Sequence, residues 1–182
     1  FYNTDISNNI TKKTKLLSRL TPFQSTLTIN DTSITKFEKN EMVNKVFGNS
    51  IQDSFKSSMH SSINENLLIG CVASNNGYEK KFGCTHKREI YVNKENNDLK
   101  GTDHIFKAKD GYPIRYAFRF HINPELSVVK TMSGNSALIQ ISKNKSLLFT
   151  VNDENLEIEK SLFLGEKKII HGTCITISGN LV

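Results

Sequence analysis

The sequence predicts an all-β fold, an antiparallel β-sandwich, on three observations. In residues 112–124, large apolar side chains occupy every second position from Ile114 to Ile122, and two arginines, an alanine and a histidine fall between them. Such a period of two is typical of a β-strand. Further short apolar runs follow, separated by turn residues at intervals of about 8–12 positions. No strand–helix–strand unit and no internal repeat interrupts this pattern.

The first half of the chain contains the least regular part of the pattern. Residues 1–22 are polar and basic and are interpreted as a loop or lid. The serine-rich residues 50–64 are interpreted as an exposed connection, and residues 75–78 as a turn because they contain two asparagines and a glycine. A polar hairpin turn is expected at 93–98. From their apolar or alternating runs, strands are expected at 24–29, 67–73, 82–92 and 99–106.

The second half is a series of short alternating runs. An Asp-Gly turn at Asp110 and Gly111 precedes the strand that ends at Pro124. Turns are expected wherever Ser, Gly, Asn and Asp gather between the apolar runs. The further strands are expected at 126–129, 137–141, 147–151, 156–159, 162–164, 168–170 and 174–177.

Length and charge limit the classes of function. The 182 residues suffice for one domain, so 1–182 is read as a single β-sandwich domain, and its start at Phe1 suggests a fragment of a longer chain. A net charge of +6 favours polyanionic partners. No nucleic-acid-binding motif is visible, and no apolar run reaches the roughly 20 residues of a membrane helix. We therefore expect neither a nucleic-acid partner nor a membrane span.

The three cysteines, Cys71, Cys84 and Cys174, contain no C-x-x-C pair. This spacing offers neither a zinc knuckle nor a thioredoxin-type redox motif. A buried thiol is the expected role of each cysteine. One disulfide stays open as an alternative if the compartment is oxidising.

Five segments, in order, resemble the C-terminal region of heparinase II/III-like proteins. Residues 118–124, F-R-F-H-I-N-P, are similar to the family strand I-R-F-H-L-H-P, and residues 99–103, L-K-G-T-D, to its L-x-G-x-D turn. Residues 24–33 resemble its S/N-T-L strand, residues 76–88 its G-Y, F-G and H-R-R segment, and residues 156–164 its L-E-x-S-V-Y-L strand. The resemblance runs from about Ser18 to Ile177.

The resemblance implies a polysaccharide lyase with an N-terminal α/α toroid and a C-terminal antiparallel β-sandwich. Such lyases cleave acidic glycans, glycosaminoglycans among them, by β-elimination, in which cationic or polar groups stabilise a carbanion-like intermediate. Much of that apparatus lies on the toroid, which this chain lacks. The chain is therefore expected to need the toroid as a partner, to act on an acidic polysaccharide, and to reside in the periplasm or cell envelope. The alternative is a non-catalytic carbohydrate-binding or structural β-sandwich.

The resemblance also implies candidate binding residues, each with a structural alternative. Arg119 and His121 could reach an acidic sugar; alternatively, Arg119 pairs with a carboxylate on a neighbouring strand and His121 packs. His86 and Arg88 belong to a basic cluster; alternatively, they are charges on a solvated edge strand.

Arg19 and Gln24 could lie at a domain junction; alternatively, they are ordinary loop residues. Gln24 occupies the position where lyases of this family can have a histidine that helps to hold a structural metal. An amide is a poorer metal ligand than an imidazole. The sequence therefore predicts no metal site and no cofactor.

Overall fold

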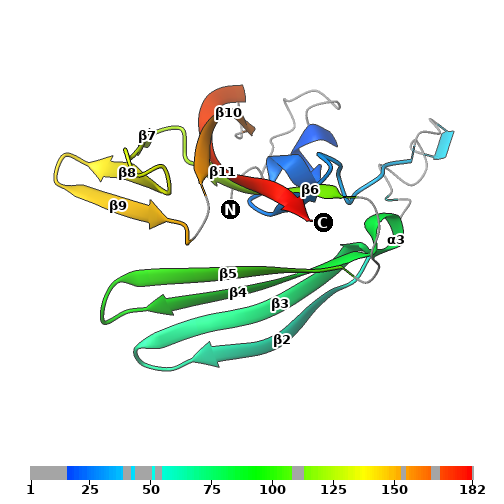
Figure 1. Cartoon of the computed structure of the whole chain (residues 1–182), viewed down its shortest axis with the longest axis horizontal. Helices are drawn as coiled ribbons and strands as arrows, with labels where there is room; N and C mark the ends of the chain where they lie inside the picture. The colour runs from blue at the N-terminus through cyan, green and yellow to red at the C-terminus, as the bar shows by residue number, and fades with distance from the viewer. Residues whose placement is uncertain are drawn as a thin grey trace. The chain divides into compact units, whose positions relative to one another are not determined.

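Every strand pair in the described part of the chain is antiparallel, which confirms the all-β antiparallel fold (Figure 1). The computed structural model describes residues 16–38, 42–43, 51, 55–107, 113–152, 155–164 and 169–181. By its contacts the chain divides into two units. The first unit comprises Phe1–Thr35 and Pro113–Leu181, and the second comprises Lys36–Tyr112.

The main sheet of the first unit has the strand order β1-β6-β11-β10. Its strands are β1 (Leu27–Ile29), β6 (Ile114–Ile122), β10 (Leu156–Leu164) and β11 (Ile169–Leu181). The alternating stretch that anchors the prediction is β6, and it lies between β1 and β11. The runs 156–159 and 162–164, expected as two strands, form the single strand β10. Residues 169–170 of the run 168–170 lie in β11 together with 174–177, and residue 168 is outside the described residues. The two long strands pair without a break from Leu156 to Leu164, so no turn divides them.

A second sheet of the first unit has the order β7-β8-β9. Its strands are β7 (Ser127–Lys130), β8 (Ser136–Ser142) and β9 (Lys145–Thr150), close to the positions predicted. The ring of Phe149 on β9 packs against Phe120 on β6, with 5.1 Å between ring centroids. This aromatic contact joins the two sheets.

The core of the first unit is formed by apolar side chains that are almost completely buried. Those with the lowest exposure are Leu27, Ile29, Ala137, Leu156, Leu164, Cys174 and Ile175. They come from β1, β8, β10 and β11. In the main sheet all of them but Cys174 share one face, and Cys174 lies on the other face, directly paired with His121 and Glu159. At roughly 25 cal/mol per Å² of apolar surface, this burial is the main stabilising contribution to the unit.

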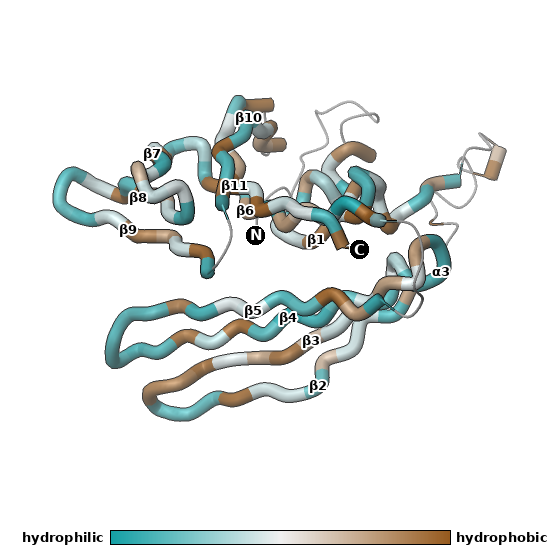
Figure 2. The backbone as a smooth tube through the Cα atoms, in the orientation of Figure 1, coloured by the Kyte–Doolittle hydropathy of each residue, from teal (hydrophilic) through white to brown (hydrophobic). Residues whose placement is uncertain are grey.

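The second unit is a four-stranded sheet with the order β2-β3-β4-β5. Its elements are β2 (Ser57–Asn64), β3 (Leu68–Tyr78), α3 (Glu79–Phe82), β4 (Cys84–Asn93) and β5 (Asp98–Lys107). The short helix α3 ends at Gly83, whose φ of +66° suits a residue without a Cβ atom. Figure 2 shows hydrophilic residues along much of β4 and β5.

Two predictions for this unit are wrong. Residues 57–64 form the edge strand β2 and not a connection. Seven of its eight residues are exposed, so the strand has no apolar alternation to reveal it. Residues 75–78 do not form a turn: β3 continues through them to Tyr78, with an irregular register between Asn75 and Tyr78.

Some predictions fall on residues that are not described. Residues 1–15 of the expected loop or lid lie outside the described ranges, as does the Asp-Gly turn at 110–111. Within 16–23 the chain forms short helical turns, including the 3-10 helix η1 (Thr21–Phe23). No helix in the described part of the chain has the length and hydrophobicity of a membrane span.

Candidate functional site

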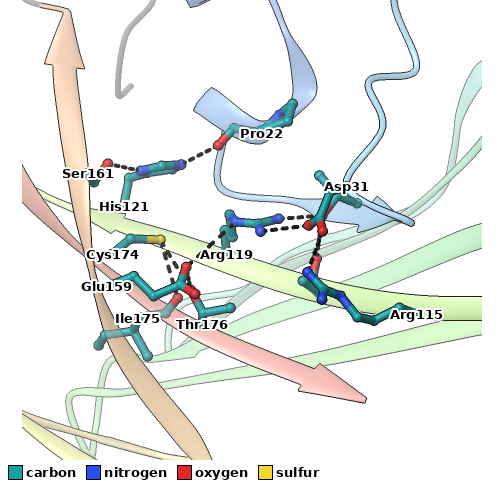
Figure 3. A network of polar contacts seen from close by, with 12 residues as sticks. Pro22, Asp31, Arg115, Arg119, His121, Glu159, Ser161, Cys174, Ile175 and Thr176 are labelled. Carbon is teal, nitrogen blue, oxygen red and sulfur yellow. Dashed lines mark hydrogen bonds and ion pairs between the residues drawn. The ribbon is translucent and has the colours of Figure 1, made fainter. Parts of the chain in front are cut away.

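The polar face of β6 is covered by a hydrogen-bonded network (Figure 3). Arg119 donates to the hydroxyl of Thr28, and its Nη2 lies 3.1 Å from Oδ1 of Asp31. Its Nε lies 4.0 Å from Oε2 of Glu159 on β10. Arg115 also pairs with Asp31. Arg119 is therefore held by carboxylates from two segments, the turn after β1 and strand β10, and neither carboxylate lies on a strand that neighbours β6.

The turn at Asn30 and Asp31 explains why this network forms. Both residues have left-handed backbone conformations, with φ of 47° and 51°, which asparagine and aspartate tolerate. The turn follows β1, which pairs with β6, so the Asp31 carboxylate lies beside the arginines of β6. The Arg119 side chain is only 16% exposed, whereas that of Arg115 is 60% exposed. Arg119 is thus the arginine that the fold encloses.

His121 is also held by neighbours from two segments (Figure 3). Its Nδ1 lies 2.7 Å from Oγ of Ser161, and its Nε2 lies 3.0 Å from the carbonyl oxygen of Pro22. Because a carbonyl only accepts, Nε2 is the protonated nitrogen. Burial, together with the nearby Arg119 charge, lowers the pKa of His121 below its ordinary value of 6.5. The ring is therefore neutral at pH 7 and links β6 to β10 and η1.

The lowered pKa of His121 predicts a loss of stability in mild acid. The unfolded chain binds a proton more readily than the folded chain, so stability is full above pH 6.5 and falls as the pH drops through the folded pKa. We expect urea midpoints to decrease between pH 7 and pH 5, and His121→Asn to make this decrease smaller. If the urea midpoint decreased equally in His121→Asn and in the unchanged protein, protonation of His121 would not be the cause of the acid sensitivity.

His86 and Arg88 lie on one face of β4 and share a carboxylate of β5. Arg88 sits directly opposite Asp103 and binds it with two hydrogen bonds, Nε to Oδ1 at 2.7 Å and Nη2 to Oδ2 at 3.1 Å. Nε2 of His86 lies 2.6 Å from the same Oδ1. Because β4 lies between β3 and β5, the alternative reading of an edge strand is wrong.

The environment keeps Asp103 ionised. Burial alone would raise the pKa of Asp103, but the hydrogen bonds from His86 and Arg88 outweigh it, and the pKa lies below its ordinary value. The side chains of His86, Asp103 and Arg88 are 10%, 14% and 20% exposed. His86 and Arg88, offered by the sequence as binding residues, are therefore both engaged by Asp103.

The remaining predicted site residues make local contacts. Nε2 of Gln24 donates to the carbonyl oxygen of Ser18 at 2.6 Å, which fixes the helical turns before β1. The backbone N–H of Arg19 closes one of these turns on Leu16, and its side chain is exposed. The described residues contain no group of three His, Cys, Asp or Glu side chains that could hold a metal ion. The absence of a metal and of a cofactor stays a prediction.

The three cysteines are free thiols. Cys84 and Cys174 are buried, whereas Cys71 on β3 is half-buried. Burial raises the pKa of both Cys84 and Cys174, so neither is an activated thiolate.

A pocket of about 390 Å³ opens on the second unit, and sequence reasoning missed it. We call it the Lys–His pocket. Nine of its ten lining residues are polar or cationic by type; the ten are Lys56, Ser58, His60, Ser74, Asn75, Asn76, Thr85, His86, Lys87 and Phe106. Of the predicted site residues, only His86 is among them. The sequence did contain one signal of this pocket, a histidine among serines in residues 57–62. Because no strand was predicted there, the side chain of that histidine could not be placed.

Comparison with known proteins identifies one family. The family model described as Heparinase II/III-like, C-terminal, matches residues 4–178, nearly the whole chain. Neither the curated proteins nor the solved structures contain a match. The match agrees with the resemblance seen in the five sequence segments.

Proposed function

Because this chain belongs to the heparinase II/III-like C-terminal domain family, we propose that it is the β-sandwich domain of a polysaccharide lyase that acts on acidic glycans by β-elimination. The family match over residues 4–178 is the observation that carries this proposal. The antiparallel sheets agree with such a sandwich, and family membership implies a polysaccharide substrate and a separate N-terminal domain.

The proposed reaction needs three groups. One neutralises the uronate carboxylate, a base removes the proton from the adjacent carbon, and an acid protonates the leaving glycosidic oxygen as the carbon–carbon double bond forms. In the described residues, Arg88 and Arg119 already neutralise carboxylates of the protein, and His121 bonds Ser161 and Pro22. We therefore propose that this domain is not competent alone and that the base and acid come from the N-terminal domain.

The test compares the 182-residue chain alone with the complete product of its gene on a panel of acidic polysaccharides. We expect the complete product to generate ultraviolet absorbance from the conjugated unsaturated uronate, and the chain alone to generate none. Product formation by the chain alone would contradict the need for a second domain. No product from the complete protein on any acidic polysaccharide would overturn the lyase proposal.

A non-catalytic carbohydrate-binding role is the second candidate. The alternative includes a purely structural role, and the internal pairing of Arg88 with Asp103 and of Arg119 with Asp31 favours a role without catalysis, because these cations are engaged by the fold. Binding of an acidic glycan by the complete protein without any unsaturated product would support this role.

A further inference from the structure

We propose that the Lys–His pocket binds an acidic sugar, with the sugar's carboxylate or sulfate facing Lys56, His60 and Lys87 and its ring against Phe106. The proposal rests on the proposed function in one respect, namely that the ligand of the protein is an acidic glycan. It assigns the contact to a site within the second unit. The pocket volume of about 390 Å³ is typical of small-ligand sites, which span roughly 300–1,000 Å³.

Strand register places much of the lining on one face of the sheet. Ser74 on β3 lies directly opposite Lys87 on β4, and Thr85 on β4 lies directly opposite Phe106 on β5. Directly paired residues point to the same side of an antiparallel sheet, and residues two apart on one strand share a face. These four side chains therefore form a contiguous patch across three strands.

Two irregularities in the sheet shape the pocket. The β2–β3 register shifts between Met59 and Ser61, so His60 is the extra residue of a β-bulge. The bulge brings Nε2 of His60 within 2.7 Å of Oγ of Ser74. The second irregularity lies between Asn75 and Tyr78 on β3. Bulges often redirect side chains beside functional sites, and here both occur along one pocket.

The rim of the pocket is fixed by asparagine side chains. Oδ1 of Asn76 accepts from the backbone N–H of Lys56 at 2.7 Å, and its Nδ2 donates to Glu79 at 3.0 Å. Oδ1 of Asn75 accepts from the N–H of Gly77 at 2.7 Å, and its Nδ2 donates to Ser57 at 2.9 Å. Each amide thus binds one backbone N–H and one side chain, which preorganises this part of the pocket for a ligand.

The cations of the pocket keep donors available for an anion. Nζ of Lys87 lies 2.7 Å from Oε1 of Glu89, which uses one of its three N–H donors and steadies the side chain. Among the described residues, no ion pair involves the side chain of Lys56. None of the ten lining residues is an aspartate or a glutamate, although Glu89 and Asp103, outside the lining, bind Lys87 and His86. The charge of the lining therefore favours an acidic ligand over a neutral one.

The uncharged groups of the lining fit a sugar. Phe106 is 55% exposed, and its ring stacks on His104 with 6.0 Å between centroids, which holds it as a platform. An exposed aromatic ring beside polar groups can bury the apolar face of a pyranose while those groups bond its hydroxyls. Ser58 and Thr85 supply hydroxyls that make no hydrogen bond within the described part of the chain.

The test measures binding of three size-matched tetrasaccharides by calorimetry and by amide chemical shifts. A heparin-derived tetrasaccharide has sulfates and carboxylates, a hyaluronan tetrasaccharide has carboxylates only, and cellotetraose is neutral. We expect the acidic probes to shift signals of the pocket residues and the neutral probe to bind at least tenfold more weakly. The hyaluronan arm decides between the two anions: equal binding of both acidic probes assigns the contact to the carboxylate, and weaker hyaluronan binding assigns it to sulfate.

Variants localise the contact. Lys87→Gln is expected to weaken binding about tenfold, because hydrogen bonds to charged groups are the strong ones. Phe106→Ala is expected to weaken it about fivefold through the lost ring contact. The control is Lys100→Gln, which removes the same charge from the same face of β5, six residues and roughly 20 Å along the strand from Phe106. We expect Lys100→Gln to change binding less than twofold, and all three variants to keep the urea midpoint of the unchanged protein.

The outcomes separate this proposal from the lyase proposal. Equal weakening by Lys100→Gln and Lys87→Gln, or acidic probes that shift no pocket signal, would overturn the pocket assignment even if the complete protein forms unsaturated product. Pocket binding that the variants weaken as expected, without any product from the complete protein, would uphold the pocket and overturn only the lyase.

Discussion

Asp103→Ala is expected to lower the free energy of unfolding by about 3 kcal/mol, because it leaves two enclosed donors, His86 and Arg88, without their shared carboxylate. The effect is large since three charge-assisted contacts converge on one group that is 14% exposed. Urea unfolding at pH 7, followed by circular dichroism, measures it. A loss below about 1 kcal/mol would show that the cluster contributes no more than a surface ion pair.

The pH dependence gives this prediction a second readout. The pKa of Asp103 lies below its ordinary value of 3.8, so its contribution is complete above that pH and is lost as the pH falls through the folded pKa. The difference in stability between the unchanged protein and Asp103→Ala should therefore shrink in acid. Asp98→Ala, at the exposed start of β5, is the control and should show neither effect.

The sequence predicts a strand where apolar side chains recur at short intervals, and this also holds for the largely exposed strand β9. In β6, the apolar side chains from Tyr116 to Ile122 alternate because one side of the strand packs on the core, and this alternation is visible without any structure. In β2 the side chains are exposed on both faces, so burial imposes no pattern on its residues. This strand forms because its backbone hydrogen-bonds to the backbone of β3. Every non-proline residue can make such bonds, so they do not show in the sequence.

The functional residues show the same limit more strongly. The types of Arg119, His121, His86 and Arg88 are visible, but their partners come from other strands. Asp31 is 88 residues from Arg119, and only the register of β1 on β6 brings the two together. The Lys–His pocket depends on a bulge, which shifts the register by one residue and so defeats a prediction based on alternation. Residue types could therefore nominate candidates, but the choice between binding and structural roles required the fold.

Arg119→Ala is expected to lower the free energy of unfolding by about 2 kcal/mol. It removes the contacts to Thr28, Asp31 and Glu159 and empties the space of a side chain that is only 16% exposed. Thr28 is completely buried, so its hydroxyl keeps only the 3.3 Å bond to the carbonyl oxygen of Ala117. Because Arg119 belongs to the same strand as the core residues Ala117 and Phe118, the loss should appear as destabilisation of the first unit.

Arg115→Ala provides the matched control for this prediction. Arg115 pairs with the same carboxylate, Asp31, and lies on the same face of β6, but its side chain is 60% exposed. An exposed ion pair contributes only about 0.5 kcal/mol, so this variant should unfold at nearly the unchanged urea concentration. If Arg119→Ala lost about four times as much unfolding free energy as Arg115→Ala, burial of the Arg119 side chain, and not its charge, would explain its contribution to stability. If Arg119→Ala were as stable as Arg115→Ala while binding acidic glycan more weakly, Arg119 would instead belong to the binding surface.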